Sequence, residues 1–397
     1  MSEEIRIQTK PLSELVIINN GIDYKKNPKG NEEIPIYGTG GIMGYTSIAL
    51  NEGPAVLTGR KGSINRPFYL EGKFWNVDTI FCLKPIGANN AKWLYYSILN
   101  IDMTKLNEAT GIPSITSKSL YRLKINHFEP DKQREIAHIL TTCDTVIEQT
   151  KSAIAKYKAI KQGLLHDLFT RGLDANGHLR PCYQDAPELY QESELGMIPK
   201  EWEVKRLEEC TTYVDYRGKT PPKSDRGIVL VTAKNIRFGF IDYELSKEYI
   251  YEYAFESAMS RGKAFIGDVL ITTEAPMGNV AQIDKEGIAL AQRVIKYQGQ
   301  TNKLNNDFLK LALMSDGFQM TLVSEATGST ALGIKGSRLH KLKILIPKIK
   351  EQKGIAQRIK IIDNQIQYEE TLLQKYQSIK RGLMEDLLGG KMVAVYG

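Results

Sequence analysis

The octapeptide TGRKGSIN, residues 58–65, gathers side chains that could bind a polyanion. Two cations, Arg60 and Lys61, stand between Gly59 and Gly62. Glycine lets a backbone approach a ligand without a Cβ clash, and arginine and lysine bind phosphate oxygens. Arginine also reads guanine, whereas asparagine and glutamine read adenine, through paired hydrogen bonds. The pattern therefore favours binding of an anionic partner over catalysis.

Two groups of polar residues are the candidates for contact with such a partner. In the first half of the chain we predict contacts by Tyr37, Thr39, Arg60, Lys61, Ser63, Asn65 and Arg66. In the second half the same reasoning selects Arg217, Lys219, Lys234, Asn235, Asn279, Gln292 and Arg293. Glu274 has two open roles, because it could accept a hydrogen bond from cytosine or orient a nearby arginine.

The sequence contains no recognisable catalytic or metal-binding motif. The string RGKT at 217–220 lacks the upstream glycine of a phosphate-binding loop. The five histidines are scattered, and none of the four cysteines forms a CxxC pair or stands at ligand spacing from a histidine. We therefore expect reduced thiols, no metal site, no bound cofactor and no catalysis. An enzyme with an unrecognised site is the alternative that this absence argues against.

Composition and charge narrow the class of protein. The chain has 397 residues, of which 42% are hydrophobic and 25% charged, so it can form two or more globular domains. The net charge of +7 favours an anionic partner. Apolar runs stay below the roughly 18–20 residues of a membrane span. The opening MSEEIRIQTK is acidic where a signal peptide is basic. We expect a cytoplasmic protein with no membrane partner.

A long internal repeat indicates which elements position these residues. Ile136 and Ile355 begin matching segments 219 residues apart. At this offset KQGLLHDLFTRG matches KRGLMEDLLGGK, the aspartates 144 and 363 coincide, and so do the lysines 161 and 380. The tetrapeptide EATG also occurs twice, upstream of each segment. Such a period is too long for a solenoid unit and indicates duplication of a whole module.

Each repeated segment carries a narrow apolar stripe at helical spacing. Its members are Ile136, Leu140, Ile147, Ile154, Tyr157, Leu164, Ile355, Ile359, Ile366, Leu373, Tyr376 and Leu383. A stripe of this kind over more than four heptads predicts a coiled coil, and the other copy is the obvious partner. A duplication that pairs with itself favours pseudo-two-fold symmetry, hence antiparallel helices. At 1.5 Å per residue each helix would be roughly 50–60 Å long.

Gly163 and Gly382 stand inside the two repeated phrases. Glycine within a helix costs about 1 kcal/mol relative to alanine. The two glycines could be close-packing positions, helix ends, or places where the backbone of a partner approaches.

The repeat divides the chain into five segments. We predict a strand-rich module at 1–129, a long helix at 130–172, an extended linker at 173–198, a second strand-rich module at 199–347 and a second long helix at 348–391. Short β-type runs separated by turn signals, with one helix before each EATG, indicate the α+β class. We call the two strand-rich segments the first and second modules.

The repeated phrases resemble those of the specificity subunit of Type I restriction–modification systems. The likeness rests on KQGLLHDLFTRG and KRGLMEDLLGGK, on SELGMIPKEWEVKRL at the entry to the second module, and on EATGIPSI and the paired LKI segments at the module exits. It covers nearly the whole chain and is weakest in the modules.

The resemblance implies two target recognition domains, each reading one half of a bipartite, asymmetric sequence in double-stranded DNA, and an antiparallel coiled-coil spacer. It also implies two methyltransferase subunits, which modify adenine N6, and two restriction subunits in the full complex. S-adenosylmethionine, Mg²⁺ and ATP would belong to those partners. A coiled-coil scaffold whose modules bind protein is the alternative.

Overall fold

The computed structural model describes residues 8–24, 33–216, 221–328 and 332–389. It divides into two compact units, Met1–Ala153 with Glu369–Gly397, and Ile154–Tyr368. Two helices of 41 residues, α3 (Pro130–Thr170) and α9 (Ile349–Gly389), each contribute residues to both units. Within the described ranges no helix has the length and hydropathy that a membrane span requires.

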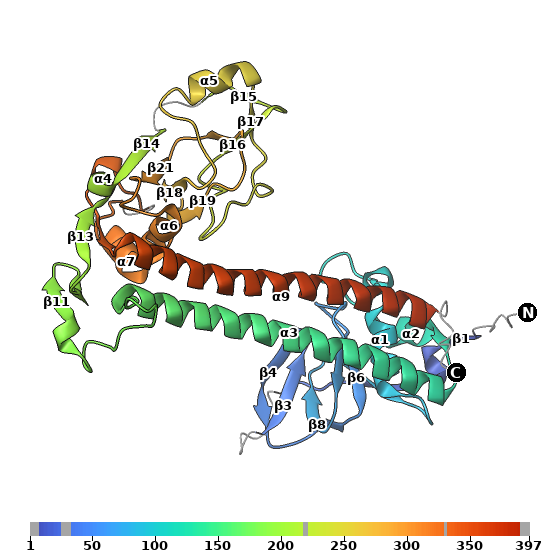
Figure 1. Ribbon diagram of the computed structural model, residues 1–397. Coiled ribbons are helices and arrows are strands. Elements are labelled where there is room, and N and C mark those ends of the chain that lie inside the picture. The colour runs from blue at the N-terminus through green and yellow to red at the C-terminus, as the bar shows by residue number, and fades with distance from the viewer. Residues whose placement is uncertain (1–7, 25–32, 217–220, 329–331, 390–397) are drawn as a thin grey trace, which may run out of the picture. The chain divides into compact units, whose positions relative to one another are not determined.

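The first unit contains the first module, which is built from two four-stranded sheets and one strand pair (Figure 1). One sheet has the order β2 (Val16–Asn20), β9 (Ile80–Pro85), β6 (Ala55–Gly59) and β7 (Phe68–Leu70). The other has the order β4 (Gly41–Thr46), β3 (Ile34–Gly38), β8 (Lys73–Asn76) and β5 (Asn51–Glu52). The third is the pair β1 (Gln8–Pro11) and β10 (Lys124–His127). Strand β6 is buried at every residue, so the β6–β7 connection starts from the centre of the core.

Two short helices complete the first module. Helix α1 (Ala91–Leu99) buries Trp93 and Leu94 against the sheet, and α2 (Ser117–Arg122) buries Leu120. The same core includes Ile136 and Leu140 of α3. Ile64 of the segment TGRKGSIN belongs to this core too, so that segment and the first turns of the long helix share one hydrophobic core.

The second unit repeats this plan in the second module. One sheet has the order β14 (Thr211–Asp215), β21 (Val294–Gly299), β18 (Val269–Thr273) and β19 (Met277–Gln282). The other has the order β15 (Lys223–Ser224), β17 (Tyr249–Ile250), β16 (Ile228–Val231) and β20 (Ala289–Leu290). Strand β13 (Glu203–Arg206) pairs with β22 (Lys343–Ile346). The short helices are α4 (Leu207–Cys210), α5 (Phe255–Ala258), α6 (Asn306–Met314), α7 (Asp316–Ser324) and α8 (Gly336–Leu339). The predicted mixture of strands and helices is confirmed.

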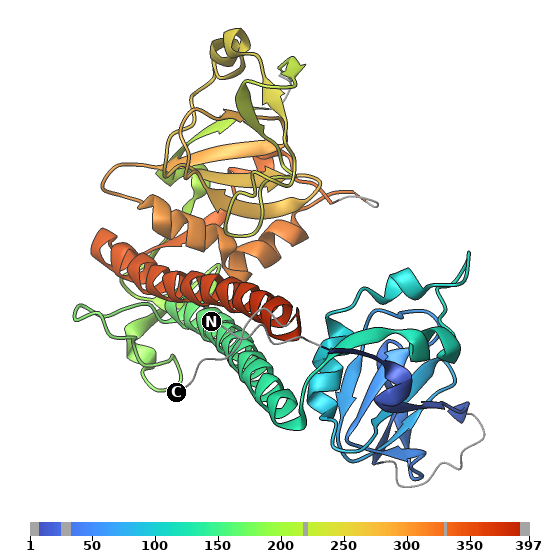
Figure 2. The same ribbon diagram turned by 90° about the vertical axis from the view of Figure 1, so that its right-hand side faces the viewer.

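Helix α6 lies between a sheet of the second module and the start of α9 (Figure 2). Its buried residues Phe308 and Leu309 share a core with Ile355 and Ile359 of α9 and with Leu168 of α3. Burying an apolar side chain of this size stabilises the fold by about 1.5–3 kcal/mol. The second module and this end of the helices are thus held as one body.

A buried glutamine connects each module to its long helix. In the first unit, Gln133 of α3 accepts from the backbone N–H of Asn90, the N-cap of α1, at 2.7 Å. In the second unit, Gln352 of α9 accepts from the N–H of Asn305, the N-cap of α6, at 2.8 Å. Both glutamines are fully buried. The repeat therefore preserves a three-dimensional contact as well as a sequence.

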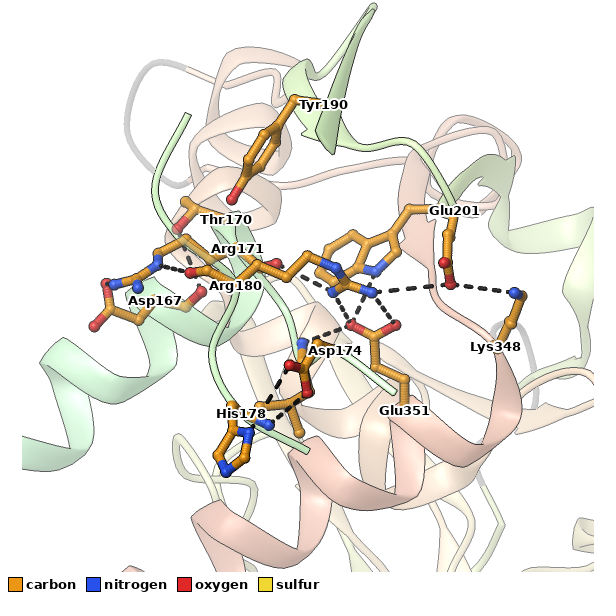
Figure 3. Close-up of polar contacts among 12 residues, drawn as sticks. Asp167, Thr170, Arg171, Asp174, His178, Arg180, Tyr190, Glu201, Lys348 and Glu351 are labelled. Atoms are coloured by element: carbon orange, nitrogen blue, oxygen red, sulfur yellow. Dashed lines mark hydrogen bonds and ion pairs between the residues drawn. The ribbon is translucent and has the colours of Figure 1, made fainter. Parts of the chain in front are cut away.

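The segment predicted to be an extended linker is folded, and that prediction is wrong. It contains the 3-10 turn η4 (Pro187–Leu189) and the antiparallel hairpin of β11 (Tyr190–Ser193) and β12 (Gly196–Pro199). Arg180 from this segment forms a two-point ion pair with Glu351 of α9, with Nη1–Oε1 at 2.6 Å and Nη2–Oε2 at 3.2 Å (Figure 3). We call this contact the clasp. Prolines and charges suggested an exposed chain, whereas Leu173, Tyr190 and Ile198 of this segment are buried.

Two predicted roles of the mid-helix glycines are also wrong. Gly163 lies inside α3 and Gly382 inside α9, so neither ends a helix. A Cβ added at either position would meet no atom within 4 Å. Close packing within the described chain therefore does not explain them, and approach of a partner is the role that stays open.

Candidate nucleic-acid interface

The segment TGRKGSIN leaves the end of β6 toward β7 and is anchored by two buried side chains, Thr58 and Ile64. A Cβ at Gly59 would lie 2.5 Å from the Ser63 carbonyl oxygen, so the tight return of the loop requires glycine there. Gly62 has a φ of +96°, a conformation that favours glycine. The loop is therefore a fixed shape that exposes the side chains of Arg60, Lys61 and Ser63.

The arginines of this region are held in place while their heads stay exposed. Arg60 donates through Nη1 to the Asp78 carbonyl at 3.2 Å, and its guanidinium lies 5.9 Å from the ring centroid of Phe81. Arg66 donates to the Gly40 carbonyl at 3.2 Å and lies 5.3 Å from the ring centroid of Phe68. A guanidinium has five N–H donors, so each arginine keeps most of its fork for another acceptor.

The other predicted residues of the first module have mixed environments. Thr39 lies beside the loop, since a Cβ at Gly62 would be 3.4 Å from its Oγ1. Tyr37 on β3 is half-buried against Phe68, and burial, together with the neighbouring Tyr45, raises its pKa. Asn65 uses its side-chain oxygen to accept from the N–H of Met103 at 2.8 Å. Asn65 therefore supports the loop, and only its amide nitrogen is left for a base.

In the second module, Arg217 and Lys219 lie outside the described residues. Lys234 and Gln292 are exposed. Arg293 is exposed as well and has a φ of +72°, which is rare for a residue with a side chain. Its Nε lies 3.5 Å from a Glu274 carboxylate oxygen. Of the two roles left open for Glu274, the structure shows the one in which it orients an arginine.

Two asparagines of the second module were predicted to contact DNA, but their side-chain amides bind the protein itself. Asn235 is only 1% exposed. Its Oδ1 accepts from Thr232, and its Nδ2 donates to the carbonyls of Asp242 and Ser246. With all these groups used inside the module it cannot reach a base, so its prediction as a DNA contact is wrong. Asn279 is half-buried and donates to the Ile236 carbonyl at 2.7 Å.

Sequence reasoning missed an aromatic turn that these asparagines support. Phe238 and Phe240 are 50% and 58% exposed on either side of Gly239, and Arg237 beside them is also exposed. Gly239 has a φ of +104° and donates to the Val280 carbonyl, so the turn is fixed to β19. Exposed aromatic rings beside a cation suit contact with bases or sugars. The string RFGF, two bulky apolar residues around a turn glycine, was the available signal.

The residues predicted to form the helix seam are all buried or half-buried. Two ion pairs accompany them. In the first unit Lys380 of α9 lies 2.5 Å from Asp144 of α3, and in the second unit Lys161 of α3 lies 2.5 Å from Asp363 of α9. The repeat matches the two aspartates with each other and the two lysines with each other. Each copy thus supplies the acid for one pair and the base for the other.

Two observations on the described residues concern metal binding and thiol chemistry. Nowhere among them do three or more His, Cys, Asp or Glu side chains meet in a group that could hold a metal ion. Burial raises the pKa of the Cys82 and Cys210 thiols to about 11, so both are protonated at neutral pH.

Comparisons with known proteins match both modules. A family model described as the Type I restriction modification DNA specificity domain matches residues 5–157 and again 199–377. The Type I restriction enzyme MjaVIII specificity subunit of Methanocaldococcus jannaschii is 28% identical over 317 residues, covering 76% of this chain and 70% of that protein.

Two solved structures resemble this fold. One is a Type-I restriction-modification system S subunit from M. genitalium, with a TM-score of 0.62, 15% identity and 98% of each chain covered. The other belongs to a study of complex assembly and conformational transition of the type I R-M system, with a TM-score of 0.56, 13% identity, and coverage of 99% of this chain and 100% of that one. At these identities the likeness concerns the fold.

Proposed function

This chain belongs to the family of Type I restriction–modification DNA specificity subunits, and from that premise we propose that it reads a bipartite, asymmetric sequence in double-stranded DNA. It would have no catalytic site and would direct methyltransferase and restriction subunits to that sequence in the cytoplasm. S-adenosylmethionine, Mg²⁺ and ATP would be bound by those partners.

Each module is a target recognition domain in this proposal, one at 1–129 and one at 199–347, with the segment 173–198 connecting the first long helix to the second domain. The double match of the family model supports two readers. Their candidate contacts differ in kind. The first presents a cationic loop, TGRKGSIN, whereas the second presents an arginine held by Glu274 and an exposed aromatic turn. Different contact groups favour different half-sites, and hence an asymmetric target.

The two long helices, 130–172 and 348–391, form an antiparallel coiled-coil spacer with pseudo-two-fold symmetry in this proposal. The exchanged ion pairs support it, because the start of α3 meets the end of α9 in one unit and the end of α3 meets the start of α9 in the other. An antiparallel pair related by a dyad produces this exchange.

Two methyltransferase subunits would bind this spacer, one on each copy of the repeated phrase. Ile160 in the second unit and Ile379 in the first are matched by the repeat, and each is 44% exposed. Gly163 and Gly382 follow them by one helical turn, with no atom within 4 Å of an added Cβ. An exposed isoleucine followed one turn later by a glycine lets a helix of a partner pack closely against the backbone. Two restriction subunits would complete the complex.

The observation that carries the proposal is the repeated match of a DNA-specificity family to both modules. Methylome sequencing of a host that expresses this chain with its partner methyltransferase tests it. The expected result is methylated adenine in one bipartite motif. A methylome that stays the same when this chain is deleted would overturn the proposal.

Exchanging one module tests whether the two modules read DNA independently. Replacing residues 1–129 with the first module of another family member should change one half of the motif and leave the other half unchanged. A change in both halves would show that the modules do not read independently.

A further inference from the structure

A second group of cations lies in the first unit, apart from the residues predicted to contact DNA. Lys118 and Arg122 of α2 and Lys124 of β10 line a hollow of about 630 Å³. Ser13, Ser117 and Tyr121, which carry hydroxyl groups, line it too. No acidic side chain of the described ranges is part of its wall. The hollow therefore presents positive charge and hydrogen-bond donors together.

These three cations are not neutralised by the protein. As far as the structure describes the chain, no carboxylate forms an ion pair with Lys118, Arg122 or Lys124. Like charges that line one concave surface reinforce each other's field and attract an anion.

The second module differs at the corresponding place. The repeat matches Lys124 with Lys343, which forms an ion pair with Glu194. Arg338, on α8 in the segment that matches α2, lies 3.2 Å from a carboxylate oxygen of Glu325. Cations are thus present in both copies, but Arg338 and Lys343 of the second copy are paired with acids of this chain.

The hollow is directly connected to the loop TGRKGSIN. The Gly62 N–H donates to the Pro113 carbonyl at 2.8 Å, and the Ile115 N–H donates to the Arg60 carbonyl at 2.9 Å. Thr116 then caps α2 by accepting from the Ser119 N–H. Only the short segment Pro113–Thr116 separates the loop from the helix that lines the hollow, so an anion bound there would fix the position of the loop.

We propose that this hollow binds the sugar–phosphate backbone of DNA beside the first half-site. The proposal rests on the proposed function, because the anion it names is the DNA that the chain reads. Lysine, arginine, serine and tyrosine side chains all donate to phosphate oxygens, and such contacts set register without reading sequence. The hollow positions the first module, while the loop selects the bases.

The test is a salt titration of DNA binding by the complex of this chain with its methyltransferase partner. The double variant Arg122→Gln/Lys124→Gln removes two charges from the hollow. The matched control, Arg338→Gln/Lys343→Gln, removes two charges from the corresponding place in the second module. The logarithm of the binding constant falls linearly with the logarithm of salt concentration, by about 0.9 per phosphate contact.

The hollow variant should lower that slope by about one to two units. It should weaken binding to cognate and unrelated DNA by the same factor and leave the methylated motif unchanged. Ethylation interference should lose its signal at phosphates beside the first half-site only. The control variant should match the wild type in slope and interference pattern.

An unchanged slope and interference pattern in the hollow variant, with thermal unfolding as in the wild type, would overturn the inference and leave the proposed function intact. Wild-type complex that does not distinguish its motif from other DNA would instead contradict the proposed function. Calorimetry with inorganic phosphate tests whether the hollow binds free phosphate instead of DNA. Binding of free phosphate that the variant loses, with an unchanged DNA slope, would also overturn the DNA assignment.

Discussion

Removing the carboxylate of the clasp should destabilise the second unit strongly. The Glu351 carboxylate accepts from the backbone N–H of Leu173 at 2.7 Å, from the Trp202 indole N–H at 3.1 Å, and from two guanidinium nitrogens of Arg180. The side chains of Arg180 and Glu351 are only 9% and 7% exposed. The variant Glu351→Met would leave two buried N–H groups without their acceptor. It would also leave the buried Arg180 cation with only the Arg171 carbonyl and the more distant Glu201 carboxylate as partners.

Breaking one side of a buried ion pair costs about 3–5 kcal/mol. Each further buried donor left unsatisfied costs about 1–3 kcal/mol, although relaxation of the segment toward water offsets part of this. We therefore expect Glu351→Met to lower the free energy of unfolding of the second unit by about 3–5 kcal/mol. Glu351→Gln keeps an acceptor oxygen and the side-chain length, so it should cost less than Glu351→Met.

The double variant Arg180→Met/Glu351→Met provides the critical comparison. Replacing a whole buried ion pair by apolar side chains is often neutral or stabilising. The double variant should therefore recover much of the stability that Glu351→Met loses. Urea unfolding followed by tryptophan fluorescence, with Trp202 inside the clasp, measures all three variants. A loss below about 1 kcal/mol in Glu351→Met, or a double variant that is no more stable than Glu351→Met, would refute the reasoning.

Three further predictions concern the seam, the loop and the thiols. Ile147→Asp with Ile366→Asp places charges at two buried seam positions, each at a cost of several kcal/mol, so the melting temperature should fall; an unchanged value would contradict the helix pairing. Lys61→Ala should weaken binding to all DNA alike and lower the salt slope by about one unit. Arg60→Ala should instead lose about 1–3 kcal/mol of discrimination between bases at one position of the first half-site. Titrations against single-base variants of the site distinguish the two roles. Since burial raises the pKa of the Cys82 and Cys210 thiols to about 11, iodoacetamide at neutral pH should label Cys182 and spare those two, as peptide mass mapping would show.

Periodicity made the long helices predictable from the sequence. A stripe at steps of three and four has a single local explanation, and α3 and α9 follow it closely. The two ion pairs between the helices could also have been predicted from the sequence, because the repeat matches Asp144 with Asp363 and Lys161 with Lys380. An antiparallel dyad brings each acid to the base of the other copy, as the structure shows within each unit.

The clasp and the buried asparagine were harder to predict, for two physical reasons. Arg180 and Glu351 are 171 residues apart, and an isolated arginine in a proline-containing segment has the same local signature as an exposed linker residue. The prediction for Asn235 was wrong for a local reason. An asparagine three residues after a threonine can accept a hydrogen bond from that threonine and close a turn as readily as it can face a ligand. Residue type alone does not distinguish a buried, structural side chain from an exposed one, because that difference depends on burial in the folded chain.

The way each module joins its helix bears on how such proteins diversify. Strand β1 pairs antiparallel with β10 from Pro11↔Lys124 to Gln8↔His127, and β13 pairs with β22 from Arg206↔Lys343 to Glu203↔Ile346. Entry and exit of each module therefore lie side by side, as in domains that tolerate insertion. Recombination at these two strands can replace everything between them as a cassette, without a shift in helix register. A new DNA specificity can then arise in one genetic exchange, and the two long helices are inherited unchanged.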